Sequence, residues 1–395
     1  MTVETTVIPL SDPTRRPDPT TQVRSPGREW ARERLAELAD IVPDVIERIG
    51  RLRTFGHGVR NTEVHLTNAC NIRCKGCWFF EYGFDEVTED ERDIGELRAF
   101  IDRLKVKGVT SALLIGGEPT LVPARVEAFV EMLDFVTLST NGLRLFPRDG
   151  FEDVAVAISL FGGGPLDDEL RAIRPNGKTF TGLFDKALAN YRDDDRATFV
   201  YALTEPGVDY IDETVQRIAE NGNQVSFNFY SAYGSDSPLG NDDARRLLDE
   251  ALRVTAAYPE TVVSHPYYVE TMITGKSHFG TFGYDVCPSI SVEMPIHAER
   301  VANGNPVLPG FSVWGADLRT EQFCCTSGHC TDCRDSQAVF SWMLVSMRHF
   351  LETPELLRTW VEVAESYWQQ WCWSPYHPRN AEADADAGSV AVGAP

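Results

Sequence analysis

The run Leu66-Thr67-Asn68-Ala69-Cys70-Asn71-Ile72-Arg73-Cys74-Lys75-Gly76-Cys77-Trp78 decides the fold that we expect for this chain. It places three cysteines in a C-x3-C-x2-C spacing, directly after a short β-like segment from Glu63 to Thr67. Cubane iron–sulfur clusters are usually held by four cysteines. Three clustered thiolates therefore leave one iron with room for another ligand, as catalytic metal sites keep one position open.

Two other uses of these thiols compete with a cluster: reduced structural cysteines, or three of the four ligands of a zinc ion. Zinc pairs usually read C-x2-4-C and are followed at a distance by a second pair. Here three cysteines fall within eight positions, and the next cysteine along the chain is Cys287. The spacing favours an iron–sulfur cluster that reacts over both alternatives.

Short polar motifs follow the triplet, each at the end of an apolar, strand-like run. They read Gly116-Gly117-Glu118-Pro119 after 111–115, Ser139-Thr140-Asn141-Gly142 after 135–138, and Asp167-Asp168-Glu169-Leu170-Arg171 after 154–160, a run that also carries Ser159. Each motif alone is an ordinary turn or helix start. In this order behind the cysteine triplet, they resemble the radical S-adenosylmethionine (radical SAM) superfamily.

Strands alternate with amphipathic helices from about residue 62, which predicts an α/β fold with a parallel sheet. The expected strands are 62–67, 111–115, 134–139, 154–160, 197–203 and 224–230, and the expected helices are 92–106, 122–133, 180–192, 211–221 and 241–257. Six strands suit the partial (β/α)6 TIM-like barrel that the resemblance implies, with a C-terminal Cys-rich extension. In such barrels the reactive residues gather at the C-terminal strand ends.

The resemblance also implies roles for individual residues. Cys70, Cys74 and Cys77 would hold a [4Fe–4S] cluster whose open iron binds S-adenosylmethionine (AdoMet), and a radical derived from AdoMet would abstract a hydrogen atom from the substrate. Glu118 would accept a hydrogen bond from the AdoMet amino group, while Gly116 and Gly117 let the cofactor approach closely. The candidates for the ribose or the carboxylate are Ser139, Asn141 and Ser159, and the candidate for a charge-assisted pair with the carboxylate is Arg171, with Arg174 as its alternative.

A second cysteine group lies near the C-terminus. Cys324, Cys325, Cys330 and Cys333 read C-C-x4-C-x2-C, and Cys287 lies upstream. This group resembles the SPASM and twitch extensions of radical SAM enzymes, which hold auxiliary clusters. The expected ligands of a second [4Fe–4S] cluster are Cys287, Cys325, Cys330 and Cys333. A structural zinc site is the alternative, because the last two cysteines also have zinc-knuckle spacing.

Composition limits the partners and the location of the protein. The 395 residues carry a net charge of −22 without a visible cluster of Lys and Arg, which argues against nucleic acid as a partner. No apolar run approaches the ~18 to 20 residues of a membrane span, and no signal-peptide pattern precedes the helical segment. We therefore expect a cytoplasmic protein that has no membrane partner.

The chain divides by pattern into five segments. A Pro- and Thr-rich segment, 1–27, and an acidic tail, 377–395, have the composition of disordered chain. Between them we expect a helical N-terminal extension at 28–60, the barrel at 61–257, and the auxiliary-cluster region with closing helices at 258–376.

The expected activity is a net oxidation or related tailoring step on a small-molecule substrate of a natural-product pathway. A flavodoxin- or ferredoxin-type protein would donate the electron. One alternative is a ribosomal-peptide maturase of the same superfamily, and another is an iron–sulfur electron-transfer or sensing protein without a substrate. The Gly116-Gly117-Glu118 element argues against the second alternative, since an electron carrier needs no acceptor for the AdoMet amino group.

Overall fold

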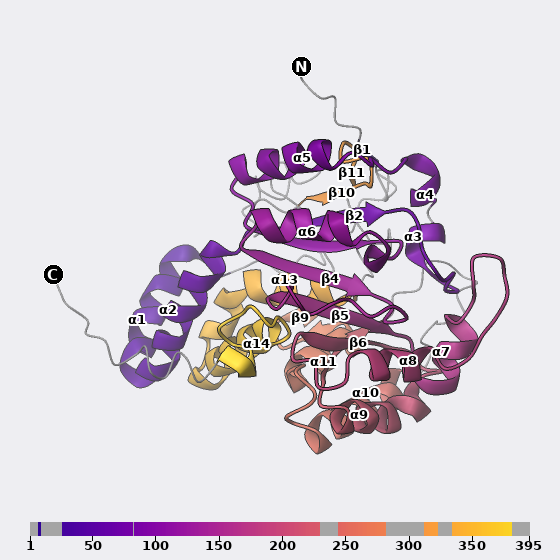
Figure 1. Ribbon diagram of the computed structural model, residues 1–395. Helices are drawn as coiled ribbons and strands as arrows, with labels where there is room; N and C mark the ends of the chain where they lie inside the picture. Colours follow the sequence, from indigo (N-terminus) through magenta and orange to yellow (C-terminus); the bar gives the residue numbers. More distant parts are fainter. Residues whose placement is uncertain are drawn as a thin grey trace.

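A parallel sheet forms the centre of the molecule (Figure 1). The computed structural model describes residues 7–8, 26–81, 83–229, 244–281, 312–322 and 334–380. Six successive strands lie side by side in chain order, each parallel to the next. Their bounds are β2 Asn61–Thr67, β3 Ser111–Gly116, β4 Phe135–Thr140, β5 Val154–Leu160, β6 Ala197–Leu203 and β7 Gln224–Phe229. The expected partial (β/α)6 barrel is confirmed.

Short strands extend this sheet beyond β2. Strand β10, Val313–Trp314, is parallel to β2, while β11, Glu321–Gln322, is antiparallel to β10 and parallel to β1, Val7–Ile8. Two-residue strands carry no periodicity, so the sequence analysis could not find them. Within the described residues, β1 and β7 are the two edges of the sheet and do not pair, so the barrel stays open.

The helices that follow the strands cover the outer face of the sheet. In α5, Ile94–Val106, the buried residues Leu97, Phe100, Ile101 and Leu104 recur at helical spacing, and the carboxylate of Asp93 caps the first turn by accepting from two backbone N–H groups. The remaining helices of this layer are α6 Pro123–Met132, α8 Leu183–Asn190, α9 Ile211–Glu220 and α10 Ala244–Ala257. The helices expected from the sequence are confirmed, with ends that differ by up to three residues.

Strand alternation separates a packed outer face from a hollow inner face. Outward residues such as Val64, Leu114 and Leu138 are fully buried in one large core against the helices. The residues between them face the inside of the barrel, among them Glu63 on β2 and Thr137 and Ser139 on β4. The main hydrophobic core therefore lies outside the barrel, and its interior is left for a site.

Helices from the C-terminal third close the open side of the barrel. They are α11 Pro266–Thr274, α13 Ser336–Val345 and α14 Pro354–Gln369. Helix α13 packs against β7, α11 and α14, and the ring of its Phe340 stacks on Tyr268 of α11 at a centroid distance of 3.8 Å. Because α13 is covered on several sides, its sequence is apolar almost all round.

The N-terminal helices α1, Arg28–Ile41, and α2, Pro43–Gly58, pack mainly against α14 and the 3-10 helix Met347–Leu351, and Figure 1 shows them beside α14. They share a second hydrophobic core with α14, and Arg48 adds a two-bond ion pair to Glu365 at 2.6 and 3.0 Å. This segment is therefore attached to the C-terminal part of the chain more than to the sheet.

The remaining elements are short. They are α3 Trp78–Glu81, α4 Phe84–Val87, α7 Gly164–Leu170, two 3-10 turns at Pro119–Leu121 and Val208–Tyr210, and the hairpin of β8 Lys276–Ser277 with β9 Gly280–Thr281. Among the described helices, none has the length and apolar content that crossing a membrane would require.

Candidate functional site

The loop that carries Cys70, Cys74 and Cys77 runs from the end of β2 across the C-terminal edge of the sheet. Backbone hydrogen bonds fix it on both sides: Gly117 and Glu118 donate to the carbonyls of Thr67 and Ala69, at 2.7 and 2.8 Å. On the other side, the loop donates from Arg73 to Ile173 and from Lys75 to Leu170. These hydrogen bonds therefore fix the cysteine loop between the residues that follow β3 and the segment at the end of α7.

The three thiols are free and partly buried, and their surroundings disfavour the thiolate form. Burial raises the pKa of Cys70 to about 12, and burial together with the neighbouring Cys74 raises that of Cys77 to about 12. Burial also raises the pKa of Cys74, although Arg171 opposes the shift. Thiols in such a setting become thiolates when a cation is bound to them, and binding releases their protons.

Among the described residues, no group of three His, Cys, Asp or Glu side chains is arranged around a single metal ion. A cubane cluster binds each thiolate at a different iron, so its ligands do not converge on one point. Three coupled, free thiols on one fixed loop suit three of the four positions of a [4Fe–4S] cluster. The chemistry of this donor set therefore fits the expected group.

Glu118 is 1% exposed and is oriented entirely by its own chain. Its Oε1 accepts from the backbone and hydroxyl of Thr120 and from the hydroxyl of Thr140, at 2.7 to 3.1 Å, while Oε2 accepts from the backbone N–H of Asn141 at 2.9 Å. Oε2 accepts a single hydrogen bond among the described residues, and Glu118 lines the cavity, so Oε2 has an acceptor position left for a ligand. The hydrogen bond from the AdoMet amino group stays a prediction for that position.

Gly116 and Gly117 are needed for packing against the cysteine loop. The sequence analysis gave a different reason for them, the close approach of the cofactor. A Cβ on Gly117 would lie 2.1 Å from the carbonyl oxygen of Ala69, and one on Gly116 would lie 2.6 Å from that of Thr67. Gly116 also has a φ of 121°, which L side chains rarely adopt. Both glycines allow β3 to approach the backbone of the loop.

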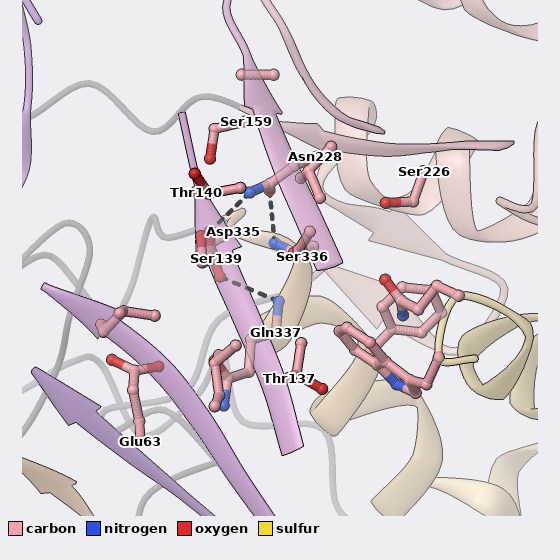
Figure 2. Close-up of a pocket in the computed structure, with 18 of the residues that line it drawn as sticks. Glu63, Thr137, Ser139, Thr140, Ser159, Ser226, Asn228, Asp335, Ser336 and Gln337 are labelled. Carbon is pink, nitrogen blue, oxygen red and sulfur yellow. Dashed lines mark hydrogen bonds between the residues drawn. The ribbon is translucent and has the colours of Figure 1, made fainter. Parts of the chain in front are cut away.

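The three candidates for ribose or carboxylate contacts lie along the same cavity but differ in their partners. The amide of Asn141 donates to Asn71 at 2.7 Å and accepts from the backbone of Leu143 at 3.0 Å, so it fixes the cysteine loop. The hydroxyls of Ser139 and Ser159 face the cavity, and neither has a hydrogen-bond partner among the described residues (Figure 2). These two hydroxyls are the ones available to a ligand.

Arg171 is buried and held by groups of its own chain. Its guanidinium forms an ion pair with Asp167 at 2.8 Å and donates to the carbonyl of Ser159. Burial lowers its pKa, but Asp167 and Cys74 raise it by more, so the side chain stays charged next to the cysteine loop. The pairing with a carboxylate of AdoMet stays a prediction. Arg174, its alternative, is exposed and lies over the ring of Phe180.

One cavity of about 880 Å³ connects these residues. It begins at the cysteine loop and Glu118 and continues through the barrel to the N-terminal strand ends at Asn61 and Ser111. Its walls include polar side chains that the sequence analysis did not select. They are Glu63 and Thr137 on the strands, Ser226 on β7, and Asp335, Ser336 and Gln337 at the start of α13.

Residues after α14 form the floor of this cavity. The indole N–H of Trp373 donates to the hydroxyl of Thr137 at 3.3 Å, and its ring lies 4.8 Å from that of Phe135, at the start of β4. Trp371 lies parallel to Trp373 with centroids 6.1 Å apart. No local signal marks these positions as part of a site, because they reach the barrel only through the packing of α14.

The second cysteine group lies outside the described residues. Cys287, Cys325, Cys330 and Cys333 all fall there, so the expected auxiliary cluster stays a prediction. The ninth cysteine, Cys372, is buried three residues after the end of α14.

Residues 64–180 match the family model described as the Radical SAM superfamily. The chain contains a radical SAM domain. The match starts in β2 and ends in the loop after α7, so it includes the cysteine triplet, Glu118 and Arg171. The family implies a [4Fe–4S] cluster and AdoMet, in agreement with the donor set at the radical SAM cysteines.

Solved structures also resemble the chain. Native anSMEcpe with bound AdoMet is 15% identical, with 59% of this chain and 71% of that chain covered and a TM-score of 0.43. Streptococcus suis SuiB bound to S-adenosylmethionine is 16% identical (61% and 60% covered, TM-score 0.39), and HydG, a maturase of the [FeFe]-hydrogenase, is 10% identical (93% and 96% covered, TM-score 0.38). No curated protein has a detectable match to the chain.

Proposed function

We propose that this protein is a radical SAM enzyme that removes a hydrogen atom from a small-molecule substrate, in a net oxidation or related tailoring step of a natural-product pathway. The observation that carries the proposal is the cavity that joins the cysteine loop to a polar barrel interior. A protein that only carries electrons has no use for such an interior. When bound, the cluster and AdoMet would supply the radical chemistry for abstraction of a hydrogen atom.

Residues of this chain would bind the cluster, orient AdoMet and enclose the substrate. Cys70, Cys74 and Cys77 would hold the cluster, and Glu118, fixed by four hydrogen bonds, would orient the amino group of AdoMet. The side-chain amide of Asn141, directly after β4, donates a hydrogen bond to Asn71 and so fixes the position of the cysteine loop relative to β4. The inner wall of the barrel and the rings of Trp371 and Trp373 would exclude water and hold one substrate C–H group within reach of the cofactor.

The position of the cavity inside the barrel, covered in part by described elements, supports a small molecule over a peptide. Helix α13 covers the open side of the barrel, and the segment after α14 forms the floor of the cavity. Further parts of the proposal are a second [4Fe–4S] cluster at Cys287, Cys325, Cys330 and Cys333, and a flavodoxin- or ferredoxin-type electron donor.

Anaerobic reconstitution tests this function. We expect roughly eight irons per chain and 5′-deoxyadenosine after reduction in the presence of AdoMet. A Cys70→Ala/Cys74→Ala/Cys77→Ala variant should keep about four irons and form no 5′-deoxyadenosine. About four irons with roughly one zinc in the parent would replace the second cluster by a zinc site. A fully loaded parent that neither binds AdoMet nor cleaves it would overturn the proposed enzyme.

A further inference from the structure

The three thiols of the cysteine loop meet different hydrogen-bond donors. Cys70 and Cys77 accept from backbone N–H groups of the loop itself. Cys74 accepts from its own backbone N–H and also from the guanidinium of Arg171, which follows directly after α7. The second cysteine of the triplet therefore has a charged donor that comes from outside the loop.

Backbone hydrogen bonds hold the arginine against this sulfur. On one side of Cys74, the N–H of Arg73 donates to the carbonyl of Ile173 at 2.7 Å. On the other side, the N–H of Lys75 donates to the carbonyl of Leu170 at 2.8 Å. Both neighbours of Cys74 are thus bonded to residues that flank the arginine, and the backbone sets the contact between the two side chains.

The ion pair of Arg171 with Asp167 is buried, with side chains 3% and 0% exposed. Asp167 also accepts from the backbone N–H groups of Phe161 and Gly163, at 3.2 and 2.7 Å, which fixes its carboxylate. After burial, which raises the pKa of Cys74, the charge of Arg171 has the largest effect on that thiol and exceeds the effect of Asp167. The sulfur therefore lies in the field of a fixed cation, in a region where charges act strongly.

A cation and a hydrogen bond at a ligand sulfur favour the reduced form of an iron–sulfur cluster. A cluster bound by three thiolates carries negative charge, and reduction adds one electron to it. A nearby positive charge therefore stabilises the reduced form more than the oxidised form. Net charge, hydrogen bonds to the sulfurs and exposure to solvent are the features that set the reduction potential of such clusters.

We propose that Arg171 sets the reduction potential of the cluster held by Cys70, Cys74 and Cys77, and that Asp167 limits this effect. The inference rests on the proposed function, because it concerns the cluster of the same site. Arg171 raises the potential, so that the cluster accepts an electron more easily. Asp167 holds the guanidinium in place and cancels part of its charge. This role differs from the pairing with the AdoMet carboxylate that the sequence analysis expects.

A redox titration of the reconstituted protein, followed by electron paramagnetic resonance, tests this inference. The titration is done without AdoMet, so that a contact between Arg171 and AdoMet does not contribute. The Cys70→Ala/Cys74→Ala/Cys77→Ala variant gives the signal of any second cluster, which is subtracted.

The first test variant is Arg171→Met/Asp167→Asn, which removes both charges together and leaves no unpaired buried charge. At a fixed applied potential we expect its ratio of reduced to oxidised cluster to be about tenfold lower than in the parent. For a one-electron couple this corresponds to a midpoint potential that is about 59 mV more negative.

The second test variant, Asp167→Asn alone, should shift the potential in the opposite direction. The Oδ2 atom of Asp167 accepts from both Phe161 and Gly163, so the single carbonyl oxygen of Asn can replace it. Arg171 is then compensated less, and the reduced form gains. A general loosening of the loop would not give shifts of opposite sign. This variant also decides the inference if the double variant binds no iron.

The matched control is Arg48→Met/Glu365→Gln, which removes a two-bond ion pair between α2 and α14. It should leave the potential unchanged. The inference is wrong if the control shifts the potential as much as the first test variant, if the two test variants shift it in the same direction, or if neither shifts it. Loss of AdoMet binding by the first variant with an unchanged potential would assign Arg171 to the AdoMet carboxylate instead.

The proposed function fails separately from this inference. It fails if the loaded parent protein does not bind or cleave AdoMet, whatever the titration shows. If the parent cleaves AdoMet while the potentials of the parent and both test variants are equal, the enzyme stands and the role of Arg171 is wrong. A parent that binds no cluster at the three cysteines would overturn both.

Discussion

At the scale of single residues, Gly117 sets how closely the cysteine loop approaches the sheet. A Cβ there would meet backbone atoms of Ala69 at 2.1 and 2.5 Å, which no side-chain rotation relieves. We expect Gly117→Ala to displace the loop, to lower the free energy of unfolding by about 1 to 3 kcal/mol, and to reduce the iron bound after reconstitution. Iron analysis and denaturant unfolding measure both effects.

The matched control is Gly50→Ala. Gly50 lies in α2 and has nothing within 4 Å of the added Cβ. Alanine should stabilise this helix by about 0.5 to 1 kcal/mol and leave iron content unchanged. Full iron loading of Gly117→Ala would show that the loop tolerates the displacement.

Asp194 gives a second prediction at this scale, on the dependence of stability on pH. Burial alone would raise its pKa, but the hydrogen bond and charge of Arg196 lower it by more, and the pair lies 2.7 Å apart. The unfolded state then binds the proton more tightly than the folded state. The contribution of Asp194 is present above pH about 4 and is lost as the pH falls through the lower, folded pKa.

We expect Asp194→Asn to be less stable than the parent at pH 6, and the difference between the two proteins to shrink as the pH is lowered from 5 to 3. Denaturant midpoints across this range measure it. A difference that stays constant with pH would mean that Asp194 does not titrate differently in the two states.

At the scale of elements, the helix pair α1–α2 depends on α14 for its stability. Leu357 of α14 is fully buried in the core that these helices share, which is separate from the core outside the barrel. We expect Leu357→Ala to lower the free energy of unfolding by about 2 to 5 kcal/mol, and the exposed Leu145→Ala to change it by less than about 0.5 kcal/mol. Chemical unfolding followed by tryptophan fluorescence measures both.

Iron content and AdoMet binding of Leu357→Ala, measured without denaturant, should equal those of the parent, because Leu357 touches neither the cysteine loop nor the cavity. A loss of iron in proportion to the loss of stability would instead mean that the two cores unfold and load their cofactors as one unit.

At the scale of the whole molecule, a group of exposed cations stands out on an acidic protein. Lys75 is in the cysteine loop, and Arg174 and Lys178 are in the hairpin that hydrogen-bonds to this loop. Because the whole chain carries a net charge of −22, it would repel an acidic electron donor at most of its surface, and the donor would be steered to this patch. We expect Lys178→Glu to slow AdoMet cleavage driven by reduced flavodoxin a few-fold at low salt.

Dithionite-driven cleavage by the same variant should stay at the parent rate, because a small reductant needs no docking surface. Lys105→Glu, at the far end of α5, is the control for charge reversal alone. An equal effect of both substitutions on the flavodoxin reaction would place the docking surface elsewhere.

The sequence predicted those parts of the molecule whose signals are local. Each βα unit carries its own apolar run, turn and helix pattern, so β2 to β7 and their helices were found within a few residues. The cysteine triplet and Glu118 were found because their motifs are contiguous. Asp335 and Trp373 were missed, since they join the site from more than a hundred residues beyond Asn228 and Thr137, through the packing of α13 and α14.

Glu63 and Ser226 were missed for a different physical reason. Strand alternation shows that two faces exist, but both faces are buried here, so periodicity does not tell which residues point inward. Only the register of six neighbouring strands shows that the smaller, more polar set lines a cavity.

The separation of the main core from the inner wall has a consequence for evolution and for protein engineering. Most side chains that hold the sheet together point outward, so inward positions such as Ala157 and Val200 contribute less to global stability. Their replacement would reshape the chamber at small cost to the fold. A chain built in this way can change the compound it accepts by few substitutions, and a library restricted to the inner wall would retain a high proportion of folded members.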